Sequence, residues 1–234
     1  MEYEFDVLAH IGRFQIFTLG HWANVVKALK LARVVALVIG SDDQPRSPRN
    51  PLTTAERITM ITKVFPREVA DGRIVFLPQI NTLYNDPIWV KSVRASVTSV
   101  ANRLVPVGKR RIGLIGHAKD ATSYYLGIFP GWEGVEVPNV GGIDATTVRN
   151  EYFGRGVILR HMVPPEVASW MEDFKDTAAF KAVEAEYIFD ALYKKPYKKL
   201  SDKDFEDFVV ANGTLNAVDL LKEFNRQYLS LIHI

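Results

Sequence analysis

The turn from Gly12 to His21 holds the residue types and spacing best suited to chemistry in this chain. It reads GRFQIFTLGH and joins an apolar run to a segment with helical spacing. Glycines let the backbone approach another group closely, and the first turn of a helix presents unpaired amides with a partial positive charge. With Arg13, Thr18 and His21 as further donors, this turn is suited to bind an oligophosphate. A tight turn in which His21 only starts the helix is the alternative.

The turn differs from two widespread phosphate-binding motifs. The chain contains neither the P-loop pattern G-x-x-x-x-G-K-[ST] nor the dinucleotide fingerprint G-x-G-x-x-G. An oligophosphate site at this turn therefore belongs to another class of protein.

Short apolar runs alternate with helical patterns from the N-terminus to about residue 153. Strands are predicted at 5–11, 33–39, 73–77, 111–115 and 134–137, and helices at 21–29, 53–65, 90–104, 120–129 and 145–153. Thr53 and Glu56 form a capping-box pattern at one helix start. This alternation predicts an α/β fold, a Rossmann-like doubly wound parallel sheet, in which ligands bind where strands end and helices begin.

After Pro164 the strand pattern stops. Helical patterns follow at 165–175, 180–193, 203–211 and 214–230. We therefore predict an α/β domain over residues 1–163 and a helical C-terminal subdomain over 164–234, either packed on the sheet or separate from it. The helices after residue 200 are assigned only to packing or to contacts in a homo-oligomer.

The composition is that of an ordinary globular protein. The 234 residues are 47% hydrophobic and 24% charged, with a net charge of +2 that argues neither for nor against nucleic acid. No apolar run approaches the roughly 20 residues of a membrane span. The absence of cysteine excludes disulfides and thiol nucleophiles, and His10, His161 and His233 have no metal-ligand spacing with one another. We expect a cytoplasmic protein with neither a membrane nor a nucleic acid as partner.

Several motifs, in order along the chain, resemble one enzyme family. GRFQIFTLGH resembles the first signature of nucleotidylyltransferases, with Thr18 in its first position, and IDATTVR (143–149) resembles the second, I-S-x-T-x-x-R. Together with NPLTTAER (50–57), LPQINTLYNDPIWV (77–90) and GHAKDATSYYL (116–126), they resemble the nicotinamide-mononucleotide adenylyltransferases. The nearest likeness is to the adenylyltransferase half of bifunctional proteins that also carry a Nudix hydrolase, over roughly residues 5 to 195.

This resemblance implies a reaction and its main residues. The mononucleotide phosphate would attack the α-phosphate of ATP in line, giving NAD and pyrophosphate, with Mg²⁺ bridging the ATP phosphates. Arg13, Thr18 and His21 would contact these phosphates, with His21 at the α-phosphate, and Arg149 would hold the β- and γ-phosphates. An exposed helix arginine is the alternative for Arg149.

The resemblance also implies contacts with the two substrates. Trp89 would stack on the nicotinamide ring, with a half-buried core tryptophan as the alternative, and Asn85 would bind the carboxamide. Arg46, Arg49 and Arg57 flank a proline-rich loop and are candidates for the mononucleotide phosphate, with solvated surface arginines as the alternative. Adenosine would lie at Gly116, His117, Lys119 and Asp120, with a hydrogen-bonded loop histidine as the alternative for His117. The remaining binding candidates are the motif residues Gly12, Phe14, Gln15, Gly20, Asp144, Thr146 and Thr147.

Two departures from the family pattern stand out. Asp144 occupies the usual serine position of the second signature, where we expect it to cap the helix and point away from the phosphates. No Nudix box follows residue 190, so hydrolase activity is not expected. A pantetheine-phosphate or cytidylyl transferase, and a regulator that senses NAD or ATP without turnover, are the alternative functions.

Overall fold

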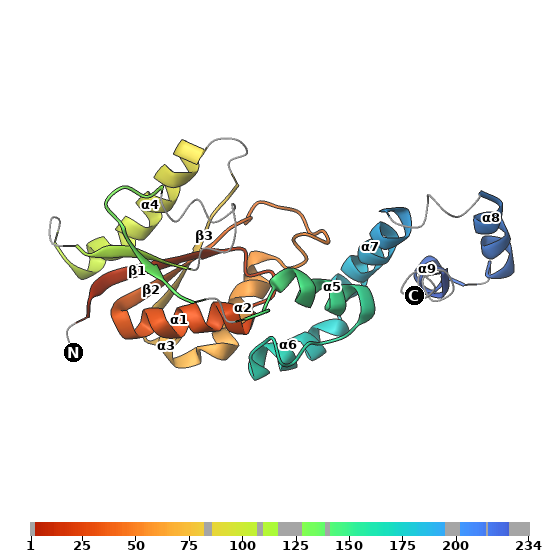
Figure 1. The fold of residues 1–234 in the computed structure, drawn as a ribbon, viewed down its shortest axis with the longest axis horizontal. Coiled ribbons are helices and arrows are strands. Elements are labelled where there is room, and N and C mark those ends of the chain that lie inside the picture. The colour runs from red at the N-terminus through yellow and green to blue at the C-terminus, as the bar shows by residue number, and fades with distance from the viewer. Residues whose placement is uncertain are drawn as a thin grey trace.

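The structure is a computed structural model that describes residues 3–81, 86–106, 110–116, 128–138, 141–194, 202–213 and 215–224. Within these residues, a parallel five-stranded sheet forms the centre of the protein. The strands are β1 (Phe5–Gly12), β2 (Ala32–Ile39), β3 (Ile74–Pro78), β4 (Ile112–Gly116) and β5 (Glu133–Glu136). Their order is β3-β2-β1-β4-β5 (Figure 1). All paired strands are parallel. The predicted α/β class is confirmed, and the order reverses beside β1, which is where doubly wound sheets bind ligands.

Helices cover both faces of the sheet. α1 (Leu19–Leu31), α2 (Thr54–Val64) and the short α3 (Pro66–Ala70) lie on one face, and α4 (Asp86–Leu104) lies on the other (Figure 1). The alternation of β2 explains the two cores, because Leu37 and Ile39 join the cluster on the α1 side while Ala36 and Val38 join the one on the α4 side. The predicted helix at 120–129 falls almost entirely outside the described residues.

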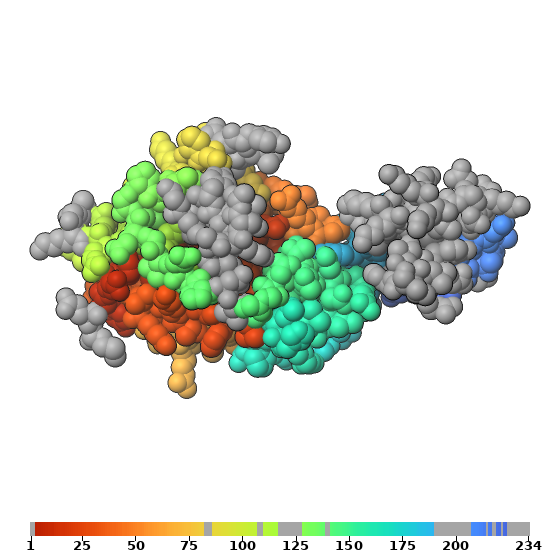
Figure 2. Space-filling model, in the orientation of Figure 1, coloured from red at the N-terminus to blue at the C-terminus, as the bar shows by residue number. Residues whose placement is uncertain are grey.

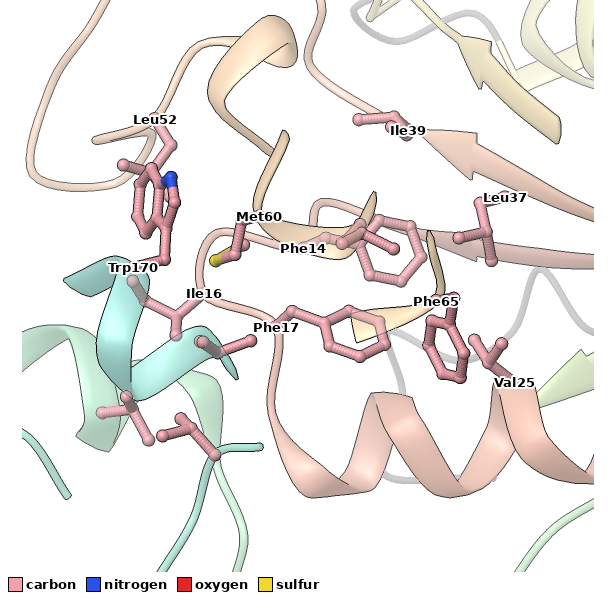
Figure 3. Close-up of a cluster of buried hydrophobic side chains, with 14 of the residues drawn as sticks. Phe14, Ile16, Phe17, Val25, Leu37, Ile39, Leu52, Met60, Phe65 and Trp170 are labelled. Carbon is pink, nitrogen blue, oxygen red and sulfur yellow. The ribbon is translucent and has the colours of Figure 1, made fainter. Parts of the chain in front are cut away.

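Five helices complete the described chain. They are α5 (Ala145–Arg155), α6 (Pro165–Lys175), α7 (Ala178–Lys194), α8 (Asp202–Ala211) and α9 (Ala217–Phe224). The cluster on the α1 side continues into α5, α6 and α7, so it contains residues from both sides of the predicted boundary at 163. Figure 3 shows part of it, with Trp170 of α6 among side chains from the turn after β1 and from α2.

The last two helices extend away from the sheet. α8 lies at the end of the molecule furthest from β1 (Figure 2). Lys222 of α9 contacts Glu184 of α7, with 3.5 Å between its Nζ atom and a carboxylate oxygen. No helix in the described part of the chain is long and apolar enough to cross a membrane. The cytoplasmic location stays a prediction.

Candidate active site

The turn between β1 and α1 is shaped by an aromatic side chain folded under it. Phe14 has a φ of 49°, in the left-handed region, and its ring is 1% exposed. A β-carbon at Gly12 would lie 3.0 Å from that ring, which is tighter than most real side-chain contacts. Any larger residue at position 12 would therefore have to displace the Phe14 ring. The ring of Phe14 lies in the core, so this predicted binding residue can offer only its backbone to a substrate.

His21 is fixed in one orientation at the start of α1. Its Nδ1 accepts a hydrogen bond from the Thr18 amide at 3.1 Å, and the Thr18 hydroxyl oxygen lies 3.1 Å from the same nitrogen. The imidazole also stacks on Phe17, with 5.6 Å between ring centroids. Because Nδ1 accepts, the proton of the neutral ring is on Nε2. His21 is thus prepared to act as a donor through Nε2.

Arginine side chains from separate segments gather beside this turn. Nη1 of Arg13 donates to the Arg49 carbonyl at 3.3 Å and lies 3.5 Å from Oδ1 of Asn50. Burial lowers the pKa of Arg13, and the charges of Arg149 and Arg49 lower it further. The two neighbouring charges therefore disfavour the charged form of Arg13, and an anion bound beside it would relieve this repulsion.

Arg149 is buried at the start of α5, with 6% of its surface exposed. Its Nη2 donates to the Thr146 hydroxyl at 3.3 Å, while its Nε has no hydrogen-bond partner within the described residues. The loop before α5 approaches α1 closely, since a β-carbon at Gly20 would lie 4.0 Å from Cγ2 of Ile143. The two signatures therefore meet, and Arg149 is not an exposed helix arginine.

Asp144 caps α5, as the sequence predicts. Its Oδ2 accepts hydrogen bonds from the Thr147 amide at 2.9 Å and from the Thr147 hydroxyl at 3.1 Å. A carboxylate in this position satisfies an amide of the first helical turn and favours the positive end of the helix. The Thr147 amide and hydroxyl are therefore already engaged, whereas Thr146 faces solvent apart from its bond to Arg149.

Arg57 has a structural role in place of the predicted phosphate contact. Its five N–H donors meet five acceptors, all in the protein: the carbonyls of Arg13, Gly40, Ser41 and Thr53 and the hydroxyl of Thr54. Burial lowers its pKa to about 10, while the Asp42 carboxylate acts to raise it. Since Arg57 is 1% exposed, it has no donor left for a substrate and instead joins the ends of β1 and β2 to α2.

Gln15 and Arg46 are also engaged by the protein. The Gln15 amide donates to the Leu52 carbonyl at 3.0 Å and accepts from the Leu52 amide at 2.9 Å. Both guanidinium ends of Arg46 bind the Glu56 carboxylate, at 2.8 and 3.0 Å. Burial alone would raise the pKa of Glu56, yet these bonds and one from the Thr53 amide hold it below its ordinary value. Gln15 and Arg46 thus anchor the proline-rich loop, whereas Arg49 is exposed.

The predicted contacts to nicotinamide and adenosine are only partly described. Trp89 is half-buried and meets Phe129 edge to face, with 5.8 Å between ring centroids. Gly116 ends β4, next to β1 in the sheet. Asn85, His117, Lys119 and Asp120 lie outside the described residues. Asn50, which the sequence analysis did not single out, lies beside Arg13, and its place at the start of the NPLTTAER segment was the available signal.

Comparison with known proteins first gives a broad class for the N-terminal part of the chain. Residues 9–100, from β1 into α4, match the family described as cytidylyltransferase-like. A curated relative, the nicotinamide/nicotinic acid mononucleotide adenylyltransferase of Acinetobacter baylyi, is 34% identical over 186 residues, which are 79% of this chain and 95% of that protein. The chain belongs to the family of nicotinamide/nicotinic acid mononucleotide adenylyltransferases.

Two similar solved structures come from Francisella tularensis. Both are of a bifunctional NMN adenylyltransferase/ADP ribose pyrophosphatase, with a TM-score of 0.72 and 84% of this chain covered. One of them is 28% identical to this chain, and the other, complexed with AMP and a manganese ion, is 26% identical. The matched region spans 57% and 56% of those two chains, respectively.

Proposed function

We propose that this chain transfers the adenylyl group of ATP to nicotinamide mononucleotide, forming NAD and pyrophosphate. A phosphate oxygen of the mononucleotide attacks the α-phosphorus of ATP, and the bond from that phosphorus to the oxygen bridging the β-phosphate breaks. The electron pair of that bond leaves with pyrophosphate, and no covalent enzyme intermediate forms. The protein then has to align two anions and stabilise the charge that moves between them.

The buried guanidinium of Arg149 is the observation that carries this proposal. A buried donor without a partner is costly to a folded protein, and here Arg13 adds a second positive charge nearby. Phosphate oxygens supply both the missing acceptor and the opposite charge. We assign Arg149 to the β- and γ-phosphates and to the departing pyrophosphate, with Arg13 on the same triphosphate.

His21 is assigned to the α-phosphate. Its Nδ1 is occupied by the Thr18 amide, so the neutral ring donates from Nε2. A donor held in place before the reaction stabilises developing charge without reorganising, which is the main source of catalysis in such sites. Thr18 acts mainly by holding the ring in this orientation.

A divalent ion, Mg²⁺ in this proposal, accompanies ATP. The described residues contain no group of three or more His, Cys, Asp or Glu side chains that could hold a metal. Phosphate oxygens and water are the ligands that Mg²⁺ uses with nucleotides, so it would be bound mainly by ATP. The chemistry it supplies is neutralisation of phosphate charge. Trp89 as the platform for the nicotinamide ring remains part of the proposal.

Release of pyrophosphate tests the function. Purified protein is incubated with ATP and Mg²⁺ plus nicotinamide mononucleotide, nicotinic acid mononucleotide or phosphopantetheine, and separately with CTP plus an alcohol phosphate. Release with a pyridine mononucleotide alone supports the proposal. Release only with phosphopantetheine, or only with CTP plus the alcohol phosphate, would show that the protein is one of the alternative transferases. ATP binding without release of pyrophosphate in any mixture would show that it is a sensor. For variants of Arg149, the control is Arg155→Gln in the same helix α5, which is expected to keep full activity because the Arg155 side chain is exposed.

A further inference from the structure

Helix α7 reaches the proline-rich loop between β2 and α2 through one hydroxyl. The Tyr187 hydroxyl donates to the Pro48 carbonyl at 2.8 Å, although the two residues are 139 positions apart in the chain. The Tyr187 ring stacks on Phe153 of α5, with 5.6 Å between centroids and 18° between planes. Phe153 is fully buried. The hydroxyl is therefore held at the loop by a rigid stack.

The loop residue that Tyr187 contacts belongs to a small closed turn. The Ser47 amide donates to the Asn50 carbonyl at 3.2 Å, and the Asn50 amide donates back to the Ser47 carbonyl at 3.0 Å. These two hydrogen bonds join the ends of a four-residue turn that contains Pro48 and Arg49. A contact that holds Pro48 therefore also restrains the next two residues, Arg49 and Asn50.

Both of these residues contact the Arg13 side chain. The Arg49 carbonyl accepts from Nη1 of Arg13 at 3.3 Å, and the Asn50 side-chain oxygen lies 3.5 Å from the same atom. Tyr187 is also close enough to Arg13 to act on its pKa, which burial lowers most and Tyr187 raises. The contacts run without a gap from α7, through the loop, to the phosphate site.

We propose that Tyr187 is a positioning residue for Arg13, which places helix α7 in the machinery that binds the ATP phosphates. The proposal rests on the proposed function, because it assumes that Arg13 binds ATP. Arg13 contacts the nucleotide in the ground state and the transition state alike, so its displacement raises the KM for ATP more than it lowers kcat.

Tyr187→Phe is the test, because it keeps the ring on Phe153 and removes only the hydroxyl. The loss of one hydrogen bond predicts an increase of about two- to tenfold in the KM for ATP, with kcat within about twofold. Tyr152→Phe is the matched control. Its ring also packs on Phe153, at 4.7 Å between centroids, but its hydroxyl donates to the Met171 carbonyl at 2.6 Å, away from the loop. Tyr152→Phe is therefore expected to lower the free energy of unfolding and to leave the KM for ATP unchanged.

A double-mutant comparison separates positioning from a general structural effect. If Tyr187 acts through Arg13, adding Tyr187→Phe to Arg13→Ala changes the dissociation constant for ATP no further. Calorimetric titration with ATP alone gives this constant without any transfer reaction. Wild type that binds ATP but releases no pyrophosphate contradicts the proposed function, and the titration still decides the role of Tyr187. Equal affinity of Tyr187→Phe and wild type, or an equal loss in the Arg13→Ala background, overturns the inference.

Discussion

Arg149→Met is predicted to stabilise the ligand-free protein while it removes activity. Methionine has a similar length and no charge, so it suits a site that is 6% exposed. The Arg149 Nε, which has no hydrogen-bond partner among the residues that the structure describes, costs the folded protein about 1–3 kcal/mol, and the bond to Thr146 returns about 0.5–1.5 kcal/mol. The net gain from the substitution is about 1 kcal/mol, and for a chain of this length that raises the Tm by about 2–4 °C.

The effect on catalysis has the opposite sign. Removing one prearranged donor from a site of developing charge costs about 2.7–4 kcal/mol, or a hundred- to a thousandfold in turnover. The assays are thermal unfolding without ligand and pyrophosphate release with ATP and nicotinamide mononucleotide. Arg155→Met is the matched control, since its side chain is 70% exposed and pairs with Glu151 at 3.2 Å, and it should change neither quantity appreciably.

Two results would refute this reasoning. A ligand-free Arg149→Met protein that melts more than 2 °C below wild type would show that the buried guanidinium stabilises the fold, contrary to the predicted gain of about 1 kcal/mol. Full turnover in that variant would show that the triphosphate does not need Arg149.

Three further predictions concern neighbouring residues. Arg57→Lys leaves at least two of the five acceptors without a donor, so we expect the free energy of unfolding in urea to fall by about 2–4 kcal/mol. Wild-type stability in this variant would show that the hydrogen bonds of Arg57 do not stabilise the fold. Asp144→Ser keeps a good N-cap and removes one charge, so calorimetry should give an ATP affinity within about fivefold of wild type, and many-fold tighter binding would show that Asp144 repels the phosphates. Glu56 has a folded-state pKa below its ordinary 4.5, so its carboxylate stabilises the fold above that pH and the contribution is lost as the pH falls below it. Glu56→Gln should lose stability at pH 7 and less of it at pH 3, whereas parallel pH curves for the two proteins would exclude this linkage.

The elements with strong local signals were predictable from the sequence. The run ARVVALVI of β2 is apolar and β-branched, and its predicted and observed bounds differ by one residue. The capping box of α2 is present, with the Thr53 amide donating to Glu56 at 2.8 Å and the Glu56 amide to Thr53 at 3.3 Å. Helix α3 was missed because its five residues, Pro66–Ala70, are too few for a periodic pattern.

The partners of the site residues could not be predicted in the same way. Arg49 and Arg57 both flank the proline-rich loop and look alike in sequence, yet one is exposed and the other binds carbonyls of three segments. Gln15 pairs with a residue 37 positions away, and Tyr187 with one 139 positions away. Such contacts depend on how the elements pack and leave no local pattern. The roles assigned to the site residues, and the division of the chain at residue 163, remain predictions.

A crystal structure with a non-hydrolysable ATP analogue and Mg²⁺ tests the central claim most directly. We predict one triphosphate between the starts of α1 and α5, with Arg13 and Arg149 bonded to its oxygens and Nε2 of His21 at the α-phosphate. A nucleotide bound elsewhere, with Nε of Arg149 still lacking a phosphate partner, would contradict the claim that the two signatures form one site.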